Sequence, residues 1–193
     1  MKALVYVGEE KLDFREVADP VVKSGEQLIK VDSAGICGSD MHAYLGHDER
    51  RPAPLILGHE ASGIILGGDR NGERVAINPR VTCMKCHACI SGRENIWSKR
   101  QIISMAPREG TFAEMVSVPE VNLVNVPLDV PLEKAALTEP LAVSWHASRL
   151  ALEALHSSMD RNVLIIGGGA IGLASALAFK AMEIENIVIV EPN

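Results

Sequence analysis

The sequence predicts a mixed β and α/β fold, in which a β-rich N-terminal domain precedes a parallel β-α-β unit. Up to about residue 130, short runs with strand-type periodicity are separated by turn residues, as in small antiparallel sheets. From residue 162, a short β-branched run is followed by three glycines, an apolar helical run and a second short strand. We place the predicted domain boundary between residues 1–148 and 149–193.

The expected strands of the first domain alternate in character and are bounded by glycine, proline and aspartate. One turn, GGDRNG, consists almost entirely of residues that tolerate positive φ. The strand-like runs are KALVYV, KLDFREV, EQLIKVDSAG, ASGIIL, ERVAINP, TFAEMVSV and VNLVNV.

A helical region is predicted from Pro131 to Leu155, which is rich in alanine and leucine. Pro140 is expected to start a second helix there, because proline is favoured in the first turn. The 18 uncharged residues from Asn162 to Phe179 resemble a membrane span in composition. The glycines within them instead predict a strand, a turn and a helix.

Charge and cysteine usage restrict the class of protein. The net charge is −6 and no cluster of lysine and arginine forms a basic stripe, so a nucleic-acid partner is not expected. The chain enters a strand-like run at once, without the features of a signal peptide, and no membrane partner is indicated. Three closely spaced cysteines indicate metal ligation in a reducing compartment. A cytoplasmic protein is therefore expected.

The segment from Gly35 to Glu60 carries the first candidate metal site. Cys37 follows a predicted strand, and His59 and Glu60 follow an apolar run and Gly58, which allows a sharp turn. A thiolate, an imidazole and a carboxylate together suit a catalytic Zn²⁺, which needs three protein ligands and an open position. The alternative is a buried free cysteine beside a histidine held in a loop.

The second candidate metal site has C-x2-C-x2-C spacing and consists of Cys83, Cys86 and Cys89. Such gaps let tight turns point successive sulfurs at one ion, but a structural zinc requires a fourth ligand. His87 is a poor substitute, because side chains of neighbouring residues usually diverge from each other. Either a structural zinc or a set of exposed or oxidised thiols is therefore compatible with the sequence.

The third candidate site is the G-x-G-x-x-G turn formed by Gly167, Gly169 and Gly172. It follows a predicted strand and begins a helix. Glu191 lies at the end of the next predicted strand, as an acidic residue does in dinucleotide-binding units. These glycines would allow a pyrophosphate to approach the helix N-terminus, and the carboxylate would bind ribose hydroxyls. Because Glu191 would repel a 2′-phosphate, NAD is favoured over NADP. The alternative is a β-α-β unit without a ligand.

Taken together, these motifs resemble the zinc-dependent medium-chain dehydrogenases, and in particular the branch of the sorbitol, butanediol and threonine dehydrogenases. The resemblance covers the whole chain, and the motifs occur in that family's order. They are GICGSDMH, GHEASG, the CxxCxxC segment followed by SGRENIW, TFAEMV, TEPLAV and GGGAIG.

The resemblance implies a GroES-like catalytic domain over residues 1–148, with a structural-zinc-type lobe at 83–100. Residues 149–193 would then hold a linker helix and part of an NAD-binding Rossmann domain. The implied activity is oxidation of a polyol or secondary alcohol by NAD, with zinc as a Lewis acid on the substrate hydroxyl. Many members of the family are homo-oligomers.

The resemblance also implies site residues. Cys37 and His59 would be the first zinc ligands, with Glu60 or Glu139 completing the set. Ser39 and His42 match the family's proton relay. The remaining histidines, His47, His146 and His156, are expected to be structural.

Some features depart from the family's pattern. Trp97 stands where the lobe usually has its fourth cysteine, and the connection from Ile65 to Arg74 is short. The chain stops after the second parallel strand, where about six are usual, so turnover by this chain alone is not expected. Two further interpretations therefore stay open: a zinc-binding GroES-like remnant without turnover, and a zinc-free quinone reductase, which would not need Cys37, His59 and Glu60 together.

Overall fold

A computed structural model describes residues 1–156 and 159–192 of the 193-residue chain. The described chain divides into two compact units, Met1–Leu137 and Thr138–Asn193, each of which is treated separately below. The division falls at the start of helix α4 (Thr138–Ala154), whereas the boundary predicted between 148 and 149 lies inside that helix.

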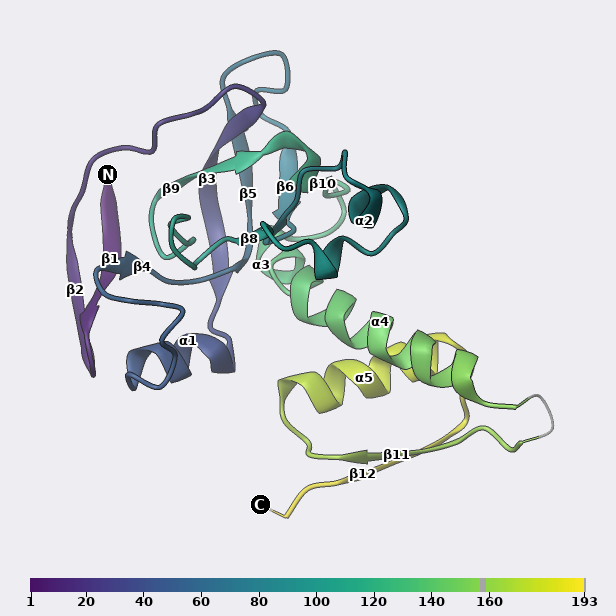
Figure 1. Cartoon of the computed structure of the whole chain (residues 1–193). Coiled ribbons are helices and arrows are strands. Elements are labelled where there is room, and N and C mark those ends of the chain that lie inside the picture. The colour runs from purple at the N-terminus through teal and green to yellow at the C-terminus, as the bar shows by residue number, and fades with distance from the viewer. Residues whose placement is uncertain (157–158, 193) are drawn as a thin grey trace. The chain divides into compact units, whose positions relative to one another are not determined.

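The first unit contains the expected antiparallel strands and several short helices (Figure 1). Its elements are β1 (Lys2–Gly8), β2 (Lys11–Glu16), β3 (Glu26–Gly35), α1 (Gly38–Tyr44), β4 (Leu55–Ile56), β5 (Glu60–Leu66), β6 (Arg74–Ile77), β7 (Arg80–Val81), α2 (His87–Ile90), η1 (Glu94–Ile96), β8 (Gln101–Ile102), β9 (Met115–Pro119), η2 (Glu120–Asn122), β10 (Leu123–Asn125) and α3 (Leu132–Ala135).

The main sheet of this unit has five strands in the order β10-β6-β5-β3-β9, and every neighbouring pair is antiparallel. A three-stranded sheet, β2-β1-β4, and a two-stranded sheet, β7-β8, accompany it. The prediction of a small antiparallel β domain is confirmed by this architecture. The strand order was not predictable, because β3 pairs with two strands that lie far from it in the sequence.

The core of the first unit is apolar and lies on the five-stranded sheet. Its side chains come mainly from the β-branched residues that predicted the strands, which pack well on a pleated surface. The members of the largest cluster are Ile29, Ala61, Ile65, Val75, Ile77, Val81, Ile103, Val116 and Val118. A smaller cluster of Tyr6, Ala43, Leu55 and Leu57 fixes α1 and β4 beside the segment that carries the first candidate site.

The second unit is the predicted helix and strand-turn-helix-strand arrangement. Helix α4 packs on α5 (Ala170–Ala181), and α5 packs on the parallel pair β11 (Asn162–Ile166) and β12 (Asn186–Val190). Helix α4 begins two residues before Pro140, which lies in its first turn, where an N–H group has no partner to lose. None of the helices in the described part is long and apolar enough to cross a membrane.

The parallel pair exposes part of its apolar surface, as the sequence predicted for two strands covered by one helix. Leu164, Ile166 and Val188 are all exposed. Parallel strands usually have both faces covered, so this pair is expected to be marginally stable when nothing else packs on it.

Candidate metal centre

Cys37, His59 and Glu60 are brought together by the pairing of β3 with β5. In this antiparallel register Gly35 lies opposite Glu60. Cys37, two residues after the end of β3, therefore approaches His59, which immediately precedes β5. One donor atom from each of the three residues lies within 4.8 Å of those of the other two. The predicted ligand set thus forms a cluster of one sulfur, one nitrogen and one oxygen.

The turn before β5 determines where His59 points. Gly58 has a φ of +92°, a left-handed conformation that strains other residues, so glycine is required there. Both His59 and Glu60 are buried behind this turn. Burying an imidazole and a carboxylate costs free energy unless they have polar or charged partners. A shared divalent cation is one such partner.

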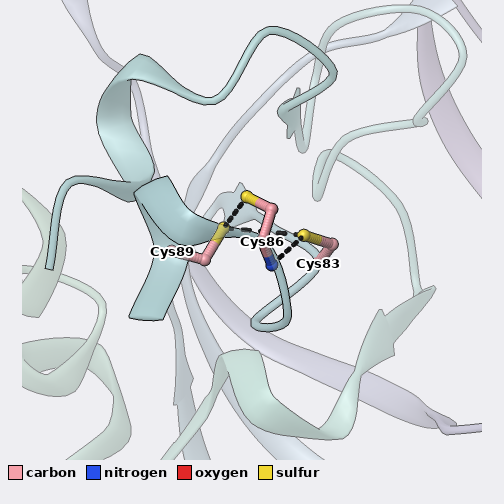
Figure 2. Close-up of side chains that lie close together, drawn as sticks. All are labelled: Cys83, Cys86 and Cys89. Carbon is pink, nitrogen blue, oxygen red and sulfur yellow. Dashed lines mark hydrogen bonds between the residues drawn. The ribbon is translucent and has the colours of Figure 1, made fainter. Parts of the chain in front are cut away.

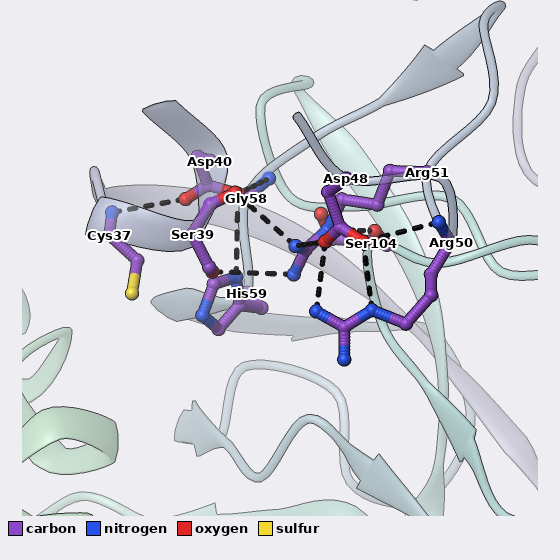
Figure 3. Close-up of polar contacts among 9 residues, drawn as sticks. All are labelled: Cys37, Ser39, Asp40, Asp48, Arg50, Arg51, Gly58, His59 and Ser104. Carbon is purple, nitrogen blue, oxygen red and sulfur yellow. Dashed lines mark hydrogen bonds and ion pairs between the residues drawn. The ribbon is translucent and has the colours of Figure 1, made fainter. Parts of the chain in front are cut away.

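Asp40 lies behind His59 and was not identified from the sequence. Its side chain is 3% exposed, and one carboxylate oxygen, Oδ1, is 3.5 Å from Nδ1 of His59 (Figure 3). The backbone N–H groups of Cys37 and Gly58 donate to its two oxygens at 3.0 and 3.2 Å. Asp40 therefore connects both sides of the site. A carboxylate behind a histidine leaves the other ring nitrogen, Nε2, to face an ion.

The environment of Asp40 keeps it ionised. Burial raises the pKa of this carboxyl, but the contact with His59 and the amide hydrogen bonds from Cys37 and Gly58 outweigh it, and the net pKa is lowered. An anionic Asp40 favours a proton on Nδ1 of His59.

A buried arginine, Arg51, fixes the start of helix α1. Its side chain donates to the carbonyl oxygens of Ser104, at 2.9 Å, and Ser39, at 3.3 Å, and to Oγ of Ser39, also at 3.3 Å. It also pairs with Asp48 at 2.7 Å, and Asp48 in turn pairs with the exposed Arg50 at 2.8 Å (Figure 3). The hydrogen bond from Arg50 is the largest cause that lowers the pKa of Asp48, to about 2.

The remaining predicted catalytic residues lie in different places. Ser39 and His42 are both on α1, where Ser39 is half-buried and His42 is exposed, with its ring centroid 6.5 Å from that of His47. Glu139 lies in the first turn of α4 and so belongs to the second unit. The cluster of the first unit contains Glu60 as its carboxylate.

The thiols of Cys83, Cys86 and Cys89 converge as their spacing predicted (Figure 2). The Sγ atom of Cys89 lies 3.5 Å from that of Cys86 and 3.7 Å from that of Cys83. Hydrogen bonds from the backbone N–H groups of Lys85 and Cys86 lower the pKa of Cys83 to about 7. Burial and the neighbouring sulfurs raise the pKa of Cys89. Within the described residues, this metal-ligand cluster contains three members, and His87 is not one of them.

Trp97→Cys is expected to add about one equivalent of tightly bound zinc and to raise the melting temperature. Trp97 directly follows η1, which packs against α2, the helix that contains Cys89. A fourth thiolate would close a tetrahedral set. Metal analysis and thermal unfolding of both proteins, with Trp97→Ser as the control, would test this. Two tightly held zinc ions in the unmodified chain would contradict it.

The glycine-rich turn of the second unit has the close packing that its spacing predicted. A Cβ atom at position 172 would lie 1.9 Å from the carbonyl oxygen of Gly167, so only glycine lets α5 start against this turn. Gly169 is the N-cap of α5. The carboxylate of Glu191, just after β12, accepts a hydrogen bond from the N–H of Gly168 at 2.6 Å. Glu191 therefore lies directly beside the turn.

Comparison with known proteins shows the family to which the chain belongs. The model of the alcohol dehydrogenase GroES-like domain matches residues 23–128, more than half of the chain. The L-galactonate-5-dehydrogenase of Escherichia coli K12 is 38% identical over 94% of the chain and 53% of its own length. The sorbitol dehydrogenase of Arabidopsis thaliana is 34% identical over 96% and 52%.

A solved structure also resembles this chain over its whole length. It is described as a short chain alcohol dehydrogenase from E. coli CFT073 complexed with NADH, and it superposes with a TM-score of 0.87 at 30% identity, over 100% of this chain and 57% of that one. The chain therefore spans about half the length of the curated relatives it matches.

Proposed function

This chain belongs to the family of the alcohol dehydrogenase GroES-like domain. We propose that it functions in a zinc- and NAD-dependent oxidoreductase, which transfers hydride from a polyol or secondary alcohol to NAD. The observation that carries the proposal is the cluster of Cys37, His59 and Glu60. Relatives named for sorbitol and L-galactonate support the substrate class.

The donor set fits zinc. Its thiolate, imidazole and carboxylate lie close enough to share one ion, and three protein ligands leave a coordination position open for a substrate. When bound, zinc would supply Lewis-acid chemistry that lowers the pKa of a substrate hydroxyl, and NAD would accept the hydride. Asp40 would orient His59 through Nδ1.

The proton released from the substrate would leave through Ser39 and His42. Arg51 donates to Oγ of Ser39, so the hydroxyl is held in a fixed position at the start of α1. His42 is exposed and can exchange a proton with water. Glu139 remains the proposed alternative or additional carboxylate ligand.

The glycine turn and Glu191 are proposed to bind NAD. Gly167, Gly169 and Gly172 place no side chain at the start of α5, where a pyrophosphate is favoured. The carboxylate of Glu191, beside Gly168, would accept hydrogen bonds from ribose hydroxyls. A relative solved with NADH supports this cofactor.

Zinc content tests the proposed centre. Cys37→Ala is expected to lower the zinc bound by purified protein by about one equivalent, because the thiolate is the strongest donor of the set. Cys86→Ala is the matched control, a half-buried cysteine in the other cluster, and it should leave this zinc in place. Unchanged metal content in Cys37→Ala would exclude the assignment.

Cofactor choice is tested by titration calorimetry with NAD and NADP. Glu191→Ala is expected to lower the ratio of the NADP dissociation constant to the NAD dissociation constant by about tenfold. The reason is that the carboxylate of Glu191 would repel the 2′-phosphate of NADP. Glu185→Ala, just before the other end of β12, is the control and should keep the preference. An unchanged ratio in Glu191→Ala would show that this carboxylate does not face the ribose.

A second candidate function is a zinc-binding GroES-like unit without turnover. It needs only the first unit, which contains both groups of candidate metal ligands found in the described part. An assay of the 193-residue chain with sorbitol, 2,3-butanediol, threonine and NAD separates the candidates. Turnover comparable to that of a full-length relative would reject the second one.

A further inference from the structure

The lobe of residues 83–100 departs from a structural zinc centre in one respect, which is that its cluster has three thiols and no fourth ligand among the described residues. Closed structural sites hold zinc with four ligands, and metal-bound thiolates are protected by the ion they share. Thiols that are close together but not closed around an ion are instead available to oxidants.

We propose that Cys86 and Cys89 form a reversible intramolecular disulfide, with Cys83 as the third thiol that can exchange with it. Cys89 is central, since its sulfur lies 3.5 Å from that of Cys86 and 3.7 Å from that of Cys83, within a cluster whose sulfurs are all within 4.8 Å of one another. Cys86 is the closer partner. This inference does not depend on the proposed dehydrogenase activity.

Access differs among the three thiols in a way that suits two-step oxidation. Cys83 and Cys86 are half-buried, whereas Cys89 is buried. A small oxidant therefore reaches Cys83 or Cys86 before Cys89. Oxidation at Cys86 lets the buried Cys89, whose sulfur lies beside it (Figure 2), resolve the product. Cys37 has no second sulfur in its own cluster, which holds His59 and Glu60. It serves as an internal comparison.

The chemistry balances with hydrogen peroxide as the oxidant. The thiolate sulfur of Cys86 attacks one peroxide oxygen, so that an S–O bond forms, the O–O bond breaks and hydroxide leaves. The sulfur of Cys89 then attacks the resulting sulfenic acid, so that the S–S bond forms, the S–O bond breaks and water leaves. Two thiols and one peroxide give one disulfide and two waters, and a thiol reductant reverses the change.

The lobe can accommodate the required movement. The two sulfurs must approach from 3.5 Å to about 2 Å. None of the residues 83–100 belongs to the hydrophobic clusters found in the described part of the chain. A segment with few core contacts rearranges at low cost. Val81 and Ile103, which flank the lobe in the sequence, lie in the core and need not move.

The test is made on the whole chain, reduced and freed of metal with a chelator. After one equivalent of hydrogen peroxide, thiol titration should fall from the four cysteines of the sequence to two. Peptide mass mapping without reduction should find Cys86 joined to Cys89, and dithiothreitol should restore four thiols. Cys83→Ser should still form this disulfide. Cys89→Ser should form a disulfide within the lobe much less readily than the unmodified chain, because it lacks the central sulfur.

Three results would overturn the proposal. The first is that Cys89→Ser forms a lobe disulfide as readily as the unmodified chain. The second is that the disulfide found joins Cys37 or two separate chains. The third is that one equivalent of zinc, added back to the Cys37→Ala chain, blocks oxidation of Cys86 and Cys89, since the lobe would then be a closed metal centre.

Discussion

Arg51→Met is expected to lower the free energy of unfolding of the first unit by about 3 kcal/mol, at the low end of the range for breaking a buried ion pair. Arg51 is 3% exposed and satisfies two backbone carbonyls as well as Asp48 and Ser39. Its loss leaves the carbonyls of Ser104 and Ser39 without this donor. The expected loss of stability is at the low end of that range because Asp48 still pairs with Arg50.

Arg50→Met is the matched control, since it removes the other arginine from the same carboxylate. The side chain of Arg50 is 71% exposed, and exposed pairs contribute about 0 to 1 kcal/mol. Urea denaturation followed by far-ultraviolet circular dichroism would give both values. If the two variants were equally stable, the buried position of Arg51 would have no energetic consequence.

The way in which Arg51 is held also explains why sequence reasoning missed it. The run from His47 to Arg51 has two acidic residues followed by two arginines, next to a proline, a composition typical of a solvated loop. Its burial depends on Ser104, 53 residues away, and that contact exists only after the chain has folded. A contact of this range has no signal in local periodicity.

Features that depend on local geometry were predictable. The C-x2-C-x2-C spacing placed three sulfurs together, and the G-x-G-x-x-G turn placed Gly172 against Gly167, because both depend on a few consecutive residues. The strands were also predictable from their alternation. Their order in the sheet was not, since β3 pairs with strands reached by long connections.

The candidate zinc centre was predictable only in part, because it depends both on local motifs and on how distant strands pair. Cys37 and His59 are 22 residues apart, and their proximity follows from the register of β3 with β5, which residue chemistry suggested but did not determine. Asp40 was missed because a carboxylate three residues after a cysteine, at the start of a helix, is typical of an ordinary helix N-terminus. Glu139 belongs to the second unit, so its relation to Cys37 stays a prediction.

Asp40→Asn is expected to weaken zinc binding by about 10- to 100-fold, the usual cost of losing a carboxylate that orients a metal-binding histidine. The amide is neutral, so it no longer stabilises the proton on Nδ1 of His59, and the opposite ring nitrogen becomes a weaker donor. Asparagine keeps nearly the same shape, and its single oxygen can accept from one of the N–H groups of Cys37 and Gly58, which bond different oxygens of Asp40. The variant therefore tests charge with little change in packing.

Competition for zinc with a chelator of known affinity measures this effect without any need for turnover. Asp32→Asn is the matched control, because Asp32 is an exposed carboxylate on β3 whose side chain accepts a hydrogen bond from Ser33. It should bind zinc as the unmodified chain does. Circular dichroism must show that Asp40→Asn is folded at the temperature of the measurement. An affinity equal to that of Asp32→Asn in folded protein would mean that His59 does not depend on Asp40, and that the buried carboxylate serves only the backbone at the start of α1.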